Sequence, residues 1–436
     1  MPTLVRRPLV LLLLVGANAP AAPVAAQEPA ADFGAIFDEH WERLRDDYPY
    51  FELYGVDWEA ERAEHRPRAV AAANRTELAW ELARLLSVLK DPHVDYLPPL
   101  DLMTGWAIPD VRIATIERKP HVLEWGAGLD AVGPAPFRDD PRAYPEIVLV
   151  QGTPIGCGVE VLAAGPVGST LKLRLRWPDG TETDEQLRRL DAGILPPPKQ
   201  HFGERWIVHG RVGSIGYLRV KTFDPERGTL GPAGKMTPIL RERLAELSDT
   251  DGLILDLQGN GGGVVAASDP FLSHFLERRR SYRWGSSGGK QRVLVPRSPR
   301  YTGAVAVLVD ERSASGGEWA ARILRDAGRA TVVGGPTVGA EAAVHRSTAA
   351  DGSTILFSAW PMVEPGVTPF QGRGVELDHA LPLTLEAARA HGFDQALERV
   401  RRARFAQALE VLGAPAADLD ALLALADEAD REEETR

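Results

Sequence analysis

Residues 304–318 read AVAVLVDERSASGGE, an apolar run followed by small polar residues and then by the start of a helical pattern. This order predicts a buried strand, a sharp turn and a helix. Such a turn exposes one side chain, here Ser315, and directs free helical N–H groups towards whatever that side chain attacks. The same residues also fit a capping box, in which Ser315 and Glu318 only cap their own helix.

A second glycine-rich turn strengthens the catalytic interpretation. Residues 253–263 read LILDLQGNGGG, a buried-type strand that ends in glycines where backbone can approach a ligand closely. A free N–H of Gly261 or Gly262, together with that of Gly316, would form a two-donor oxyanion hole. A tight turn without chemistry is the alternative.

Two other meanings of glycine-rich turns are excluded. The dinucleotide fingerprint fails because Val264 stands where its last glycine is required. A phosphate-binding loop fails because residues 334–339 are followed by Ala340 and Glu341 instead of Lys and Ser or Thr.

Three blocks in this order resemble the core of the tail-specific, or C-terminal processing, serine peptidases. They are LDLQGNGGG (255–263), VLVDERSASGGEWAARILRDAGRATVVGGPTVG (307–339) and FQGRGVELDHALP (370–382). Upstream, VDWEA (56–60) and LLSVLKDPHVDYLPP (85–99) resemble the helical lead-in of that family. The resemblance implies a multidomain α/β fold and a serine nucleophile.

The resemblance implies that Ser315 is the nucleophile, but the lysine that activates it in processing peptidases is replaced by Ala340. No other lysine can substitute from the second half, because Lys290 is the last one in the chain. Related branches that lack this lysine, including the tricorn-like peptidases, use a histidine that matches His93. Their glutamate near the final block is replaced by Gln371.

His93 is therefore the expected general base, since imidazole titrates near working pH. The alternative is a structural role, because His93 follows a helical run and can cap its carbonyls. His345 is the second candidate base. The sequence does not select the orienting or auxiliary group, for which the candidates are Asp91, Glu341, Glu364, Gln371 and Glu376.

The composition fits a large enzyme and excludes several other classes. A chain of 436 residues with 44% hydrophobic content can bury two or three cores. The net charge of −11 argues against a nucleic-acid partner. One cysteine, Cys157, and histidines without paired spacing predict no metal, and we expect no cofactor. We expect a peptide or protein substrate, and homo-oligomer formation stays open.

The first 26 residues predict a secretory signal peptide. Arg6 and Arg7 precede the apolar run 9–15, and small residues then lead to an expected cleavage after Ala26. The apolar run is too short to span a bilayer, and no later run is longer. We expect a secreted or periplasmic protein, and the bacterial compartment rests on the resemblance.

The coarse pattern predicts four regions after the signal peptide. They are a helical region (32–105), a β module of short strands (108–190), an α/β region (205–390) and a C-terminal helical segment with an acidic tail (391–436). The β module resembles a degenerate PDZ domain, and the family resemblance implies that the α/β region is the peptidase core. Two functions remain open at this point. One is a secreted serine endopeptidase, and the other is a catalytically inactive homologue that binds peptides or another ligand.

Overall fold

The computed structural model describes residues 32–108, 111–125, 140, 142–157, 159–189, 206–224, 236–285, 290–363 and 368–434. The predicted signal peptide lies outside these residues and stays a prediction.

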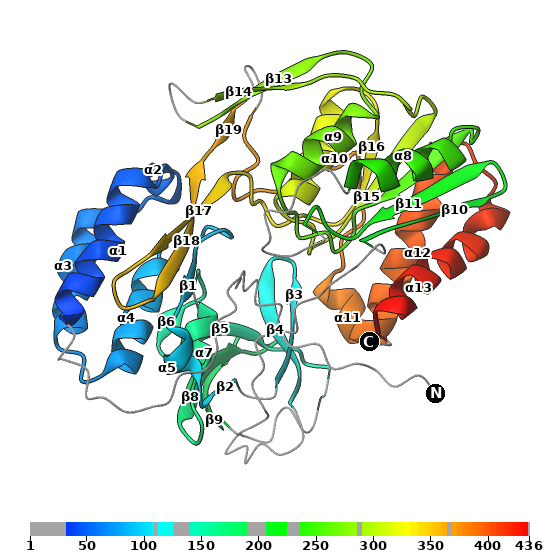
Figure 1. Ribbon diagram of the computed structural model, residues 1–436. Helices are drawn as coiled ribbons and strands as arrows, with labels where there is room; N and C mark the ends of the chain where they lie inside the picture. Colours follow the sequence, from blue (N-terminus) through cyan, green and yellow to red (C-terminus); the bar gives the residue numbers. More distant parts are fainter. Residues whose placement is uncertain are drawn as a thin grey trace.

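A six-stranded sheet forms the centre of the C-terminal half (Figure 1). Its order is β10-β11-β12-β15-β16-β20; β10 and β11 are antiparallel and all the other pairs are parallel. Apart from the exposed Ala304 at the start of β15, the strands β12 and β15 are buried along their length, as expected for a sheet covered on both faces. The bounds are β10 Ile207–Val212, β11 Ile215–Val220, β12 Gly252–Asp256, β15 Ala304–Val309, β16 Thr331–Gly334 and β20 His379–Ala380.

Helices cover both faces of this sheet. One face packs against α8 (Met236–Glu246), α9 (Val265–Ser273) and α10 (Gly316–Asp326). The other face packs against α12 (Phe393–Val411) and α13 (Leu419–Glu434), through side chains such as Phe405 and Leu422. The α/β fold predicted from the alternating pattern is confirmed. The C-terminal helices contribute to the core of the same chain.

The N-terminal helices form a separate layer at one side of the molecule (Figure 1). Asp32 caps the first of them by accepting the N–H of Ala35, and Phe37, Trp41 and Leu44 are buried on its inner face, as their helical spacing predicts. The bounds are α1 Phe33–Asp47, α2 Phe51–Tyr54, α3 Trp58–Val70, α4 Arg75–Ser87 and α5 Leu100–Met103.

A β hairpin connects this helical layer to the core. It consists of β17 (Ala343–Thr348) and β18 (Thr354–Trp360), and β18 pairs with β1 (Asp95–Leu97) in antiparallel register. Because β1 follows His93 closely and β17 follows Glu341 closely, the hairpin brings two distant parts of the sequence together.

An antiparallel sheet forms the region after the N-terminal helices. The strand order of this sheet is β3-β4-β5-β8-β9, and β6 pairs with β5. The short helix α7 lies between β6 and β7 in the chain, and β2 and β7 form a separate pair. The bounds are β2 Trp106–Ala107, β3 Val111–Ile116, β4 Lys119–Trp125, β5 Glu146–Val150, β6 Thr153–Pro154, α7 Val159–Ala163, β7 Gly165–Pro166, β8 Thr170–Arg176 and β9 Glu182–Arg188. The PDZ-like assignment of this module stays a prediction.

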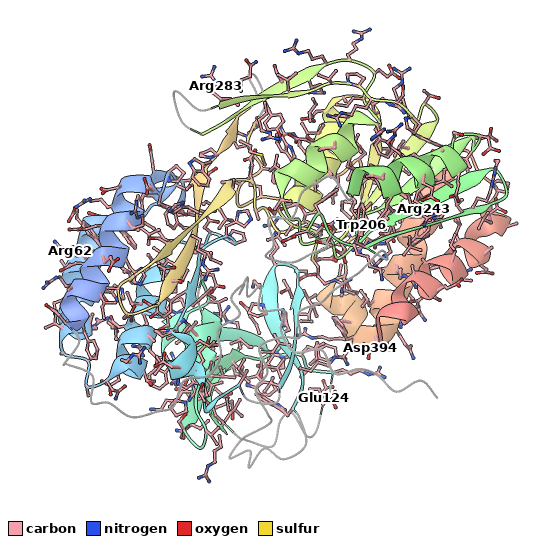
Figure 2. All side chains as sticks on the ribbon, in the orientation of Figure 1. Arg62, Glu124, Trp206, Arg243, Arg283 and Asp394 are labelled. Carbon is pink, nitrogen blue, oxygen red and sulfur yellow. The ribbon has the colours of Figure 1, made fainter. Side chains whose placement is uncertain are left out.

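One contact and several remaining elements complete the architecture. Asp394 at the start of α12 binds Arg112 of β3, so the module contacts the C-terminal helices (Figure 2). A three-stranded arm projects from the core, and α11 leads into α12. The bounds are β13 Arg280–Trp284, β14 Lys290–Leu294, β19 Met362–Val363, α11 Leu385–His391 and a short 3-10 helix Ala416–Asp418.

Candidate active site

Ser315 lies at the turn between β15 and α10 in an unusual backbone conformation. Its φ is 51° and its ψ is −119°, a combination that L-residues other than glycine rarely adopt. Ser315 is half-buried, whereas the helix residues from Gly316 to Leu324 are all buried. A non-glycine residue held in this region stores about 1–3 kcal/mol of strain, which is typical of functional sites. The turn predicted from the sequence is therefore present in the form that suits a nucleophile.

The carboxylate of Glu318 fixes the conformation of this turn through a hydrogen bond. Glu318 is fully buried, and its Oε2 accepts the N–H of Ser315 at 2.9 Å. Glu318 thereby supplies its half of a capping box with Ser315, which is compatible with a nucleophile at the same residue. Burial raises the pKa of Glu318, and its hydrogen bonds oppose this rise.

The same carboxylate also binds the loop where a lysine was expected. Glu318 accepts the N–H of Gly339 at 2.6 Å and that of Ala340 at 2.9 Å. Ala340 is buried and 1% exposed. One acidic side chain thus fixes the Ser315 turn and the loop at position 340 relative to each other.

The glycine-rich loop after β12 packs directly on the Ser315 turn, as the sequence predicts. A Cβ built on Gly262 would lie 2.7 Å from the backbone nitrogen of Gly316. Asn260 joins the two segments, because its carbonyl accepts the N–H of Ala314 at 2.9 Å. The two turns therefore form one unit, although about 50 residues separate them.

The hydrogen bonds of this unit distinguish the candidate oxyanion donors. The N–H of Gly262 is donated to Asn260 Oδ1 at 2.8 Å. Within the described residues, the N–H groups of Gly261 and Gly316 take no part in the hydrogen bonds of either turn. The geometry therefore favours Gly261 and Gly316 over Gly262, and their role as donors stays a prediction.

His93 reaches the core from the N-terminal region. Its ring forms a hydrogen bond with the backbone of Ala342, two residues after Ala340, instead of capping the carbonyls of α4. Burial lowers the pKa of His93, and the charge of Asp91 opposes that shift. The Nδ1 atom is buried and has no hydrogen-bond partner among the described residues. A neutral imidazole with one unused nitrogen is the form that a general base requires.

Asp91 is the carboxylate that acts on His93 most directly. It is fully buried, and its Oδ1 accepts the backbone N–H of His93 at 2.9 Å. Its Oδ2 accepts the hydroxyl of Tyr48 at 3.0 Å, and its carbonyl accepts the thiol of Cys157. Among the candidates that the sequence leaves open, Asp91 is therefore the one whose charge opposes the fall in the pKa of His93.

Two of the other auxiliary candidates lie together in the core, and one does not. The N–H of Glu341 donates to Oε1 of Gln371 at 2.9 Å, and the N–H of Gln371 donates to Glu341 Oε2 at 3.3 Å. Glu376, whose side chain is 76% exposed, pairs with Arg325 on the surface. Glu364 lies outside the described residues.

Three further residues at the site carry no signal in the sequence. Tyr54 OH accepts a hydrogen bond from Gln371 Nε2 at 3.2 Å, and the Tyr50 hydroxyl is buried without a partner among the described residues. Arg118, at the β3–β4 turn, donates to the carbonyl of Thr337 at 2.9 Å. These contacts form only when distant segments dock, so no local pattern reveals them.

His345, the second candidate base, lies on β17 in an aromatic environment. Its ring packs edge-on against Phe357 and Trp360, at 5.4 and 5.5 Å between ring centroids. This packing favours a structural role for His345.

Comparison with known proteins gives a consistent result. Residues 214–381 match Peptidase family S41, and residues 29–86 match the Tricorn protease C1 domain. The carboxy-terminal processing protease CtpB of Bacillus subtilis is 28% identical over 305 residues, which cover 67% of this chain and 60% of CtpB. Tricorn protease homolog 1 of Streptomyces coelicolor is 26% identical over 83% of this chain and 36% of its own length.

The chain therefore spans 60% or less of the length of these two curated relatives. The crystal structure of mature CPAF covers 88% of this chain and 98% of its own, with a TM-score of 0.56 and 14% identity, and it supports the fold alone. Among the described helices, none has the length and apolar character needed to cross a membrane. Residues 214–381 are therefore similar to Peptidase family S41, and the chain as a whole is similar to C-terminal processing proteases such as CtpB.

Proposed function

We propose that the chain is a serine peptidase that cleaves peptide or protein substrates through an acyl-enzyme on Ser315. The observation that carries this proposal is the backbone of Ser315, held at φ 51° against Gly262 with the N–H of Gly316 beside it. A strained, partly exposed serine next to unused N–H groups is the arrangement that acyl transfer requires.

The proposed reaction uses His93 as base and acid in turn. His93 accepts the hydroxyl proton while Ser315 Oγ attacks the substrate carbonyl carbon. The N–H groups of Gly261 and Gly316 stabilise the oxyanion. Collapse of the tetrahedral intermediate breaks the C–N bond, and the protonated imidazole gives its proton to the leaving amine. Water, activated by His93, then hydrolyses the acyl-enzyme, and the negative charge of Asp91 stabilises the imidazolium in both steps.

The relatives support a substrate class. CtpB is named as a carboxy-terminal processing protease, and we propose that protein C-termini are the substrates of this chain too. Secretion to the periplasm or beyond is also proposed, on the pattern of residues 1–26. The non-catalytic binding module is not favoured, because binding alone gives no reason to keep Ser315 in a strained conformation.

Hydrolysis of a generic protein substrate such as casein tests this proposal. Wild-type protein should release peptides, and Ser315→Ala should reduce the rate to background. Ser248→Ala, at an exposed site beyond α8, is the matched control and should keep the wild-type rate. A folded wild-type protein that cleaves neither casein nor C-terminal peptides would contradict the proposal.

A further inference from the structure

We propose that Glu341 is a positioning residue for His93, and that its ionised carboxylate, held in place by Gln371, stabilises the protonated imidazole during turnover. This inference rests on the proposed function, because it assigns a role within the same site. It concerns a residue next to Ala340, so the loop without a lysine would still contribute a charge to catalysis.

The first argument is the way in which Glu341 is held. Its side chain is buried, and the residue is 2% exposed. Glu341 and Gln371 exchange two hydrogen bonds, and Oε1 of Gln371 also accepts the N–H of Ala342 at 3.4 Å. The amide of Gln371 in turn donates to Tyr54. A carboxylate fixed in this way has a defined position relative to residue 342.

The second argument is the position of His93. The imidazole is hydrogen-bonded to the backbone of Ala342, which directly follows Glu341. Its Nδ1 is buried and has no partner in the described part of the chain, and the same is true of the Tyr50 hydroxyl. Burial raises the pKa of Tyr50, and the charges of Glu341 and then Asp91 raise it further. Tyr50 therefore interacts with both Glu341 and Asp91, and His93 interacts with Asp91 and with the residue that follows Glu341.

The third argument is that Glu341 can change its charge at neutral pH. Burial raises its pKa to about 7. Arg322 and Glu318, both on α10, lower and raise this pKa respectively, and Tyr50 is the titratable group that faces it from the N-terminal helices. At pH 8 about nine-tenths of the molecules carry the ionised carboxylate, and at pH 6 about nine-tenths carry the neutral acid. Only the ionised form stabilises an imidazolium.

The test is Glu341→Gln, which keeps the shape and removes the charge. At pH 8 we expect kcat to fall about tenfold or more, with KM little changed, because the lost interaction forms in the transition state. In the wild type, kcat/KM should fall below pH 7. This fall is the acidic limb of the pH profile. In the variant the acidic limb should move to below pH 6.5, where only His93 titrates.

Relocating the carboxylate gives a second test. In Glu341→Gln/Gln371→Glu, the new carboxylate would accept the same two backbone N–H groups that Gln371 Oε1 accepts now. We expect this double variant to recover a large part of the lost kcat. Gln371→Glu alone places two carboxylates together and should shift the acidic limb above pH 7. Glu376→Gln, on the surface, is the matched control and should leave rate and profile unchanged.

These outcomes separate the possibilities. A wild-type rate and acidic limb in Glu341→Gln would overturn the inference. A loss of rate with an unchanged limb and no recovery in the double variant would also overturn it, because it would mean that Glu341 only shapes the loop. If wild-type protein is itself inactive and Ser315 is not labelled by an active-site probe, the proposed function fails instead.

Discussion

Gly262 and Ser315 are in direct contact: a Cβ built on Gly262 would lie 2.7 Å from the Cβ of Ser315. Gly262 also has a φ of 100°, a conformation that L side chains rarely adopt. The loop after β12 and the turn before α10 are therefore packed as tightly as two backbones allow. Glycine at position 262 is needed for the shape of the site.

Replacing Gly262 by Ala should lower turnover by on the order of 100-fold, because the added methyl group must displace Ser315 or the N–H of Gly316. Gly180→Ala is the matched control, since Gly180 has a φ of 85° and open space around its Cβ position. Both variants carry backbone strain, but only the first crowds the nucleophile. Equal activity of the two variants on casein would show that the contact does not matter.

Replacing Glu318 by Gln should lower both activity and stability. The carboxylate accepts the N–H groups of Ser315, Gly339 and Ala340, and an amide would place its own N–H against at least one of these donors. Leaving a buried donor unsatisfied costs about 1–3 kcal/mol. Urea unfolding and casein hydrolysis measure the two effects, with the exposed Glu386→Gln as control. A Glu318→Gln protein with wild-type stability and rate would contradict the assigned role.

The two candidate bases should behave differently. His93→Ala should remove most of the rate together with the part of the acidic limb below pH 6.5, because burial lowers the pKa of His93 from its usual value. His345→Ala should leave the rate and the pH profile largely intact. The measurement is kcat/KM on a peptide substrate between pH 5 and 9. A wild-type rate in His93→Ala would refute the base assignment and direct the search to His345.

We expect the contact that His40 makes between α1 and the β17–β18 hairpin to be sensitive to acid. Its Nε2 lies 2.8 Å from the hydroxyl of Ser353, which donates to Asp351, and burial lowers the pKa of His40 to about 4. Between pH 6.5 and 4, His40 is protonated in the unfolded chain but stays neutral in the folded protein. This residue should therefore lower the free energy of unfolding by up to about 3 kcal/mol as the pH falls through that window.

The free energy of unfolding of wild type and His40→Asn, measured in urea from pH 7 to pH 4, checks this expectation. The variant should be less stable at pH 7, because it loses the fitted imidazole, and should lose less stability on acidification. Parallel curves for the two proteins would show that His40 does not titrate in this way.

The sequence predicts those features that depend on local pattern. The strands β12 and β15 are continuous apolar runs, and the turns after them carry glycine or serine, so the fold and the meeting of Gly262 with Ser315 follow from ordinary rules. Such rules do not predict what the side chain of Asn260 binds. Its acceptance of the Gly262 N–H depends on a rotamer, and this is why the sequence could not choose between Gly261 and Gly262.

The remaining part of the site depends on docking between distant segments. His93 meets Ala342, and Tyr54 meets Gln371, across separations of about 250 and 317 residues. No periodicity or spacing encodes such contacts. The sequence could name His93, Glu341 and Gln371 as candidates, but only the packing of the N-terminal helices on the hairpin shows which of them lie together.

The central claim is that Ser315 is an activated nucleophile, and covalent labelling tests it most directly. Purified protein treated with a fluorophosphonate probe at pH 8 should be labelled, and peptide mapping by mass spectrometry should place the adduct on Ser315. Ser315→Ala should take up no probe, and His93→Ala should react far more slowly than wild type. If the folded wild-type protein takes up no more probe than Ser315→Ala, the account of this chain as a serine peptidase is contradicted.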